Sequence, residues 1–176
     1  MLTTYNLKMP HAVYGGENAM ESIATIIKTL NAKKVAMFTD KGLRKLGLFT
    51  LAEDVVKATG GDYSVLDELP PEPSHMAVQA IVDQFKCSGA DLIVACGGGS
   101  VMDAAKLASV LVTDEYGVKE LLDNPGMAQK CVPIVLIPTT AGTGAEVTPN
   151  AIVAVPEKEL KVGIVNENMI ADYVIL

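Results

Sequence analysis

The chain has 176 residues, which corresponds to about one domain at roughly 150 residues per domain. Hydrophobic residues make up 49% and charged residues 20%, so the composition excludes a disordered, a collagen-like and a low-complexity chain. With 14 Lys and Arg against 21 Asp and Glu the net charge is −7, which argues against a nucleic-acid-binding protein because no basic surface is available to neutralise phosphates.

Helical and strand patterns alternate along most of the chain. The predicted elements, in chain order, are a helix over 17–30, a strand over 34–39, a helix over 43–58, a strand over 62–66, a helix from the N-cap Ser74 to about residue 86, a strand over 91–96, a helix over 100–112 and a strand over 132–137. The strand over 91–96 is continuously apolar, as in a parallel sheet covered on both faces. We therefore expect one α/β domain over 1–176, with a Rossmann-like parallel sheet and helices on both faces.

The alternation stops after Thr139. Residues 150–155 and 161–165 are predicted strands joined by the charged turn 156–159, and 70–73 is a proline-rich, stiff loop at the end of a strand. The chain closes on the apolar stretch 171–176. Because termini are usually polar and frayed, we expect the natural protein to continue beyond it.

Three features bear on the compartment. No apolar run approaches the roughly 18 residues of a membrane-spanning helix, so no membrane association is expected. Residues 1–6 lack the basic flank and apolar centre of a signal peptide. Cys87, Cys96 and Cys131 are odd in number and form no C-x-x-C pair, so we expect buried, unpaired thiols and a cytoplasmic chain.

Three consecutive glycines, Gly97, Gly98 and Gly99, join the strand over 91–96 to the next helix. Glycines admit a tight turn and the close approach of a ligand, and the helix N-terminus offers unpaired N–H groups to an anion. Three in a row exceed what packing requires, so we interpret the turn as a pyrophosphate cradle; a ligand-free turn is the alternative. Met102 stands where the G-x-G-x-x-G pattern has its third glycine, and no P-loop is present.

Charged residues flank this turn. Asp103 and Lys106 are three apart on the predicted helix, so they form either an exposed ion pair or a pair whose carboxylate faces the ligand cleft. Asp40 follows the strand over 34–39. A carboxylate there would bind the adenosine ribose and repel a 2′-phosphate, which predicts NAD(H) over NADP(H). The alternative is that Asp40 only caps the helix that starts near Gly42.

Two longer motifs carry a family resemblance. Residues 97–106 match G-G-G-S-x-x-D-x-x-K, and 138–148 read P-T-T-A-G-T-G-A-E-V-T, with Ala145 where Ser is usual. Met-Pro at 9–10 and Tyr-Gly-Gly at 14–16 are similar to the N-terminal entry of the same family. Over nearly its whole length the sequence resembles the iron-dependent (group III) alcohol dehydrogenases.

The resemblance implies a two-domain enzyme whose dehydroquinate synthase-like N-terminal domain binds NAD(P). The helical C-terminal domain, absent from this chain, would bind Fe²⁺ or Zn²⁺ through one Asp and three His, and the metal would polarise the oxygen of a small primary alcohol or aldehyde during hydride transfer. His11 and His75 are the only histidines, so we assign no metal ligand and no catalytic residue here. The chain alone is expected to be inactive, and the full-length protein to be a homo-oligomer.

The resemblance also implies roles for particular residues. Gly97, Gly98, Gly99 and Ser100 would bind the pyrophosphate. Thr139, Thr140 and Thr143 would bind the adenine and ribose side, although strand-end threonines also cap backbone. The remaining predicted cofactor-binding residues are Asp40, Asp103 near the nicotinamide, Thr148, Asn150, Ile152, and Lys161 at the nicotinamide ribose. Glu72 stands near the adenosine, where close relatives often have Asn.

Two alternatives stay open. One is a related glycerol or maleylacetate reductase-type dehydrogenase on the same scaffold. The other is a free-standing nucleotide-binding module without catalysis. The run over 139–148 resembles the alcohol dehydrogenases better than the polyol branch.

Overall fold

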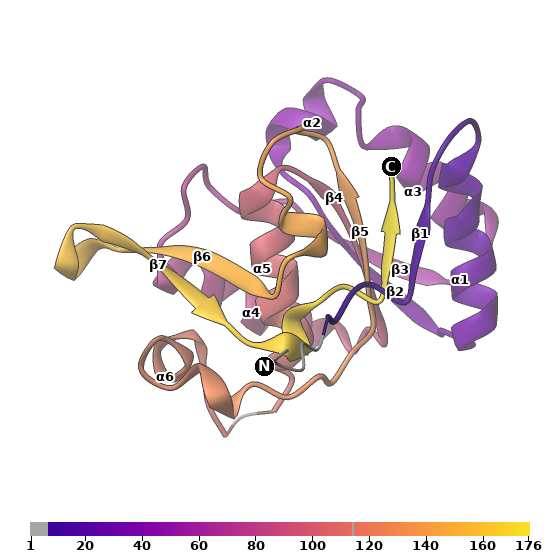
Figure 1. The fold of residues 1–176 in the computed structure, drawn as a ribbon. Coiled ribbons are helices and arrows are strands. Elements are labelled where there is room, and N and C mark those ends of the chain that lie inside the picture. The colour runs from indigo at the N-terminus through magenta and orange to yellow at the C-terminus, as the bar shows by residue number, and fades with distance from the viewer. Residues whose placement is uncertain (1–6, 114) are drawn as a thin grey trace, which may run out of the picture.

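The computed structural model describes residues 7–113 and 115–176; the prediction for residues 1–6 lies outside them. Within these residues, six strands form one parallel sheet in the order β1-β8-β5-β4-β2-β3 (Figure 1). The strands are β1 (Ala12–Tyr14), β2 (Lys34–Phe38), β3 (Asp62–Leu66), β4 (Leu92–Gly97), β5 (Ile134–Pro138) and β8 (Tyr173–Ile175). The predicted α/β fold with a parallel sheet is therefore confirmed.

Helices cover both faces of the sheet (Figure 1). On one face lie α1 (Ser22–Leu30) and α3 (Thr50–Ala58), and on the other α4 (His75–Ser88) and α5 (Gly99–Val110). Two short helices, α2 (Lys41–Lys45) and α6 (Val118–Asp123), lie outside these two layers. Side chains alternate along β2, so Val35 and Met37 pack in the core under α1 and α3, whereas Ala36 and Phe38 pack in the core under α4 and α5. Each face thus has its own hydrophobic core.

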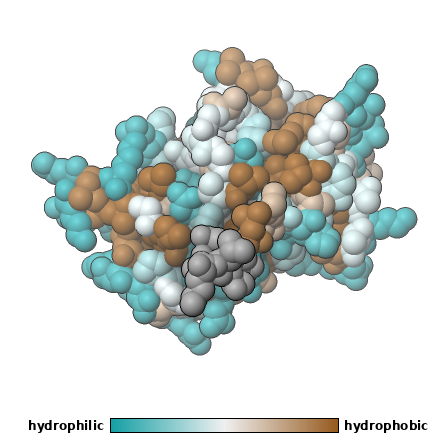
Figure 2. Space-filling model, viewed as in Figure 1, coloured by the Kyte–Doolittle hydropathy of each residue, from teal (hydrophilic) through white to brown (hydrophobic). Residues whose placement is uncertain are grey.

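A second, antiparallel pair of strands stands beside α5. β6 (Asn150–Val155) and β7 (Leu160–Val165) form a hairpin that extends away from the main sheet (Figure 1). Its inner residues Ala151, Val153 and Ile164 are buried in the α5 core. Hydrophobic residues also gather on its outer surface (Figure 2), where Leu160 and Val165 are exposed.

Several predicted boundaries were wrong. The helix predicted over 43–58 is two helices, because Gly47 adopts a left-handed conformation with φ of 72° between α2 and α3. The helix predicted over 17–30 starts at Ser22, after a single 3₁₀ turn at Ala19–Glu21. Strand β1 and helix α6 were not predicted, since each is only a few residues long.

The cysteines were predicted incorrectly in part. Cys96 is buried in β4, as expected, but Cys87 and Cys131 are exposed. The buried positions of α4 include Ile81, Val82 and Phe85, so Cys87 falls on the outer face of that helix. Cys131 lies in the loop before β5.

None of the helices described has both the length and the apolar character that crossing a membrane requires.

Candidate functional site

The glycine turn leaves backbone donors available at the start of α5. Gly98 is the N-cap residue, and the first hydrogen bond of the helix runs from the Met102 N–H to the Gly98 carbonyl at 3.1 Å. The N–H groups of Gly99, Ser100 and Val101 precede that bond and have no acceptor within the helix. By contrast, Ser74 caps α4 through its hydroxyl. The N-terminus of α5 therefore presents unpaired N–H groups and the positive end of the helix dipole to the space beyond β4.

The three glycines serve different purposes. A Cβ at Gly97 would lie 2.6 Å from the Cβ of Val101, so this glycine lets α5 pack closely on β4. Gly98 has a φ of −78°, which other residues adopt without strain. A Cβ there would lie 3.3 Å from Thr140 Oγ1, and one at Gly99 would lie 3.5 Å from Thr143. Close packing therefore requires a glycine at 97 only. Gly98 and Gly99 are not required by packing, as the sequence predicts for all but one of the three.

Two neighbouring hollows open at the carboxyl edge of the sheet. The first, of about 750 Å³, lies between the glycine turn, the start of α2 and the loop after β3. The second, of about 250 Å³, lies between α5 and the β6–β7 hairpin. Glu72, Gly99 and Ser100 line both. The first falls within the range of roughly 300–1,000 Å³ that small-molecule sites have.

Most of the predicted site residues meet around these hollows. The first hollow is lined by Asp40, Gly98, Gly99 and Ser100, and the second by Gly99, Ser100, Asp103, Thr143, Thr148, Asn150, Ile152 and Lys161. Asp40 also caps α2, because its Oδ1 accepts from the Leu43 N–H at 2.9 Å. The capping alternative is thus observed, and the carboxylate still borders the first hollow.

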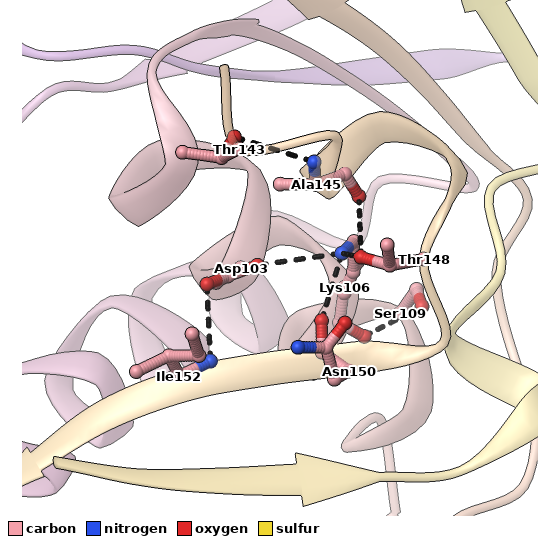
Figure 3. Close-up of polar contacts among 8 residues, drawn as sticks. All are labelled: Asp103, Lys106, Ser109, Thr143, Ala145, Thr148, Asn150 and Ile152. Carbon is pink, nitrogen blue, oxygen red and sulfur yellow. Dashed lines mark hydrogen bonds and ion pairs between the residues drawn. The ribbon is translucent and has the colours of Figure 1, made fainter.

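Asp103 and Lys106 form a buried ion pair, so the alternative of an exposed helical pair is wrong. Lys106 Nζ lies 3.3 Å from Asp103 Oδ1, and Lys106 has no exposed surface (Figure 3). Burial raises the pKa of the Asp103 carboxyl and lowers the pKa of the Lys106 ammonium. The pair holds β6: Asp103 Oδ2 accepts from the Ile152 N–H at 3.0 Å, and Lys106 donates to the Asn150 carbonyl at 2.8 Å (Figure 3).

The threonines after β5 divide between two places. Thr140 and Thr143 stand beside Gly98 and Gly99. Thr139 lines a different hollow, of about 420 Å³, together with Leu48 and other side chains on the α1 and α3 face. The structure therefore does not bring Thr139 to the hollows beside the glycine turn.

The hydroxyls of Thr143 and Thr148 make the local backbone contacts that are expected of threonines near a strand end. Thr143 Oγ1 accepts from the Ala145 N–H at 3.3 Å, and Thr148 Oγ1 donates to the Ala145 carbonyl at 3.4 Å.

The loop after β3, of which Glu72 alone is predicted to lie near the adenosine, supplies one wall of the first hollow. Asp67, Glu68, Leu69, Pro70 and Pro71 line the first hollow. The sequence predicts that 70–73 is a stiff, proline-rich loop at the end of a strand. In a parallel sheet the carboxyl ends of all strands share one edge, so the position of this loop beside the glycine turn was available from the sequence.

Candidate metal ligands do not gather among the residues that the structure describes. Across residues 7–113 and 115–176, no group of three or more His, Cys, Asp or Glu side chains is placed to bind a metal ion.

Comparison with curated proteins finds relatives along most of the chain. A sulfoacetaldehyde reductase of Bilophila wadsworthia is 38% identical over 167 residues, covering 92% of this chain and 42% of that protein. An NAD-dependent methanol dehydrogenase of Bacillus methanolicus is 29% identical, covering 93% of this chain and 43% of that protein. The chain therefore spans less than half the length of these relatives.

Solved structures give the same result. A 1,3-propanediol oxidoreductase superposes with a TM-score of 0.89 at 28% identity, covering 98% of this chain and 45% of that one. A sulfoacetaldehyde reductase from Bifidobacterium kashiwanohense, in complex with NAD⁺, superposes with a TM-score of 0.86 at 27% identity over 98% of this chain and 46% of that one. Among protein families, residues 10–176 match the one described as iron-containing alcohol dehydrogenase. The chain belongs to the iron-containing alcohol dehydrogenase family.

Proposed function

We propose that this chain forms the NAD(H)-binding part of an enzyme that interconverts a small primary alcohol and its aldehyde. The observation that carries the proposal is the uncapped N-terminus of α5, whose N–H groups open onto the hollow of about 750 Å³ at the carboxyl edge of a parallel sheet. The NAD⁺ complex of one relative and the names of the NAD-dependent and aldehyde-reducing relatives support it.

The residues present fit a dinucleotide. The donors at Gly99 and Ser100 would bind the pyrophosphate, and Gly98 has no Cβ to hinder its approach. Asp40 would accept from the adenosine ribose in the first hollow, and Lys161 would reach the nicotinamide ribose in the second. Bound NAD would accept or supply the hydride. This chain's own residues would bind and orient the cofactor.

The residues described here do not fit an iron site. In this proposal Fe²⁺ or Zn²⁺ is bound by the part of the longer relatives that this chain does not span, and no step is derived through the metal. The proposal therefore includes the expectation that the 176-residue chain binds NADH but does not oxidise a primary alcohol. A homo-oligomeric state and a cytoplasmic location of the whole protein belong to the same proposal.

The pyrophosphate assignment is tested at Gly98. We expect Gly98→Val to weaken NADH binding tenfold or more, measured by NADH fluorescence titration, because the side chain would occupy the approach to the α5 donors. The melting temperature should change little, since φ at Gly98 is negative. Gly61→Val serves as the control: Gly61 also lacks a positive φ, and a Cβ there makes no contact shorter than 3.7 Å. NADH binding by Gly98→Val at wild-type affinity would refute the assignment.

A further inference from the structure

A buried pair of charges joins two walls of the second hollow. Asp103 and Lys106 lie on the first two turns of α5, the helix that carries the glycine turn, and each binds a backbone group of β6 (Figure 3). Ile152, whose N–H is bound by Asp103, itself lines that hollow, as does Asn150, whose carbonyl is bound by Lys106. The wall opposite the glycine turn is thus attached directly to the helix that forms the turn.

Fold stability alone does not call for this pair. Taking a carboxylate and an ammonium out of water carries a large free-energy penalty, and apolar residues of similar volume often replace such a pair without loss of stability. The inner face of the hairpin already packs through Ala151, Val153 and Ile164. Apolar packing alone does not fix the position of β6 along α5. A hydrogen bond to a particular N–H and a particular carbonyl fixes where along α5 the strand lies.

We propose that Asp103 and Lys106 are positioning residues, whose ion pair holds β6 at the separation from the glycine turn that NAD binding requires. The inference rests on the proposed function and assigns Asp103 an indirect role. Both of its carboxylate oxygens are engaged, one by Lys106 and one by the Ile152 N–H. In this proposal Asp103 acts through the position of β6, which both of these contacts help to fix.

The same construction at the opposite edge of the sheet gives a matched control. Lys130 Nζ lies 3.3 Å from Asp172 Oδ2, the same carboxylate oxygen accepts from the Ile134 N–H at 2.8 Å, and Lys130 donates to the Ile170 carbonyl at 2.9 Å. Ile134 begins β5, so this pair lies at the amino edge, away from the glycine turn. Loss of one partner should lower the melting temperature at either pair, whereas positioning of the cofactor wall is expected of the first alone.

The experiment compares three variants of the 176-residue chain: Asp103→Asn, the double variant Asp103→Leu with Lys106→Met, and Asp172→Asn. Hydrogen exchange of residues 150–155, thermal melting and NADH titration are measured for each. We expect the double variant to melt near the wild-type temperature, because its charges are removed together. Its β6 amides should exchange at least tenfold faster, and NADH should bind about tenfold more weakly. Asp103→Asn should show the same two changes with a lower melting temperature.

Asp172→Asn should lower the melting temperature without altering either NADH affinity or exchange in β6. A double variant that melts like wild type and binds NADH equally well would show that the pair is only structural and would overturn the proposal. Unchanged exchange at 150–155 in that variant would also overturn it. The exchange result does not depend on NADH, so failure of the wild-type chain to bind NADH refutes the proposed function separately.

Discussion

Glu72 and Lys161 face each other across the junction of the two hollows, with Glu72 Oε1 2.7 Å from Lys161 Nζ. Glu72 belongs to the loop after β3 and Lys161 to β7, so the contact joins two walls that are 89 residues apart in the sequence. The hydrogen bond from Lys161 lowers the pKa of the Glu72 carboxyl, which therefore stays ionised at mildly acidic pH. The carboxylate competes with any bound anion for this lysine.

We expect Glu72→Gln to tighten NADH binding severalfold, because it releases Lys161 and removes a negative charge beside the pyrophosphate position. The measurement is NADH titration at low and at physiological ionic strength, where added salt should reduce the difference between variant and wild type. Glu157→Gln, at the turn of the same hairpin, is the control for a general charge effect. Weaker binding by Glu72→Gln would show that Glu72 contributes to the site.

Gly97→Ala should destabilise the fold by about 1–3 kcal/mol, because the added Cβ would overlap Val101 at the junction of β4 and α5. Urea unfolding measures the loss. The double variant Gly97→Ala with Val101→Ala should recover part of it, since truncating Val101 removes the Cγ atoms that lie 2.8 and 2.9 Å from the new Cβ. An alanine at 97 that leaves the unfolding midpoint unchanged would contradict the close packing described here.

Asp40→Ser should raise the affinity for NADPH relative to NADH by at least tenfold. Serine keeps the hydrogen bond to the Leu43 N–H that caps α2, so the change isolates the carboxylate charge from the cap. Removing that charge removes the repulsion of a 2′-phosphate. Parallel titrations with both cofactors test this. Equal binding of NADPH and NADH by the wild-type chain would contradict the expected preference.

Cys96 should be the thiol of the native chain that reacts most slowly with a disulfide reagent. Burial raises its pKa to about 11 from an ordinary value of 9.0, whereas Cys87 and Cys131 are exposed. At pH 8 a disulfide reagent should therefore label two thiols quickly and the third only after unfolding.

The same pKa shift makes stability depend on alkaline pH. Because the folded pKa lies above the unfolded one, the contribution of Cys96 is complete below pH 9 and is lost as pH rises toward 11, by about 2 kcal/mol. The difference in unfolding free energy between wild type and Cys96→Val should change over that interval and be constant below it.

The fold was largely predictable because long elements carry strong local patterns. Strand β4 is apolar throughout, and Ser74 marks the start of α4 with its side chain. Short elements carry little such pattern. The three residues of β1 become a strand only by pairing with β8, a contact between the two ends of the chain that no local pattern records.

The sequence motifs predicted which residues belong to the candidate site, but they predicted less well how those residues are arranged and buried. The sequence placed Asp103 and Lys106 three apart on one helix, but their burial depends on β6, which begins 44 residues after Lys106. Likewise Thr139 and Thr140 are adjacent in the motif, yet Thr139 lines the hollow on the α1 and α3 face and Thr140 lies beside Gly98. Strand β5 ends at Pro138, so both threonines lie in the loop that follows, and the motif does not state how that loop turns.

The place of β8 within the sheet bears on the order of assembly during synthesis. The first strand along the chain, β1, pairs with β8 alone, and Ala12 is aligned with Tyr173. A nascent chain that has not yet released residues 173–175 from the ribosome can assemble β5, β4, β2 and β3, but it leaves β5 as an open edge and β1 without a neighbour. Such an edge is a template for pairing with other chains. Residues 173–175 therefore close the edge of β5 at which premature association would begin.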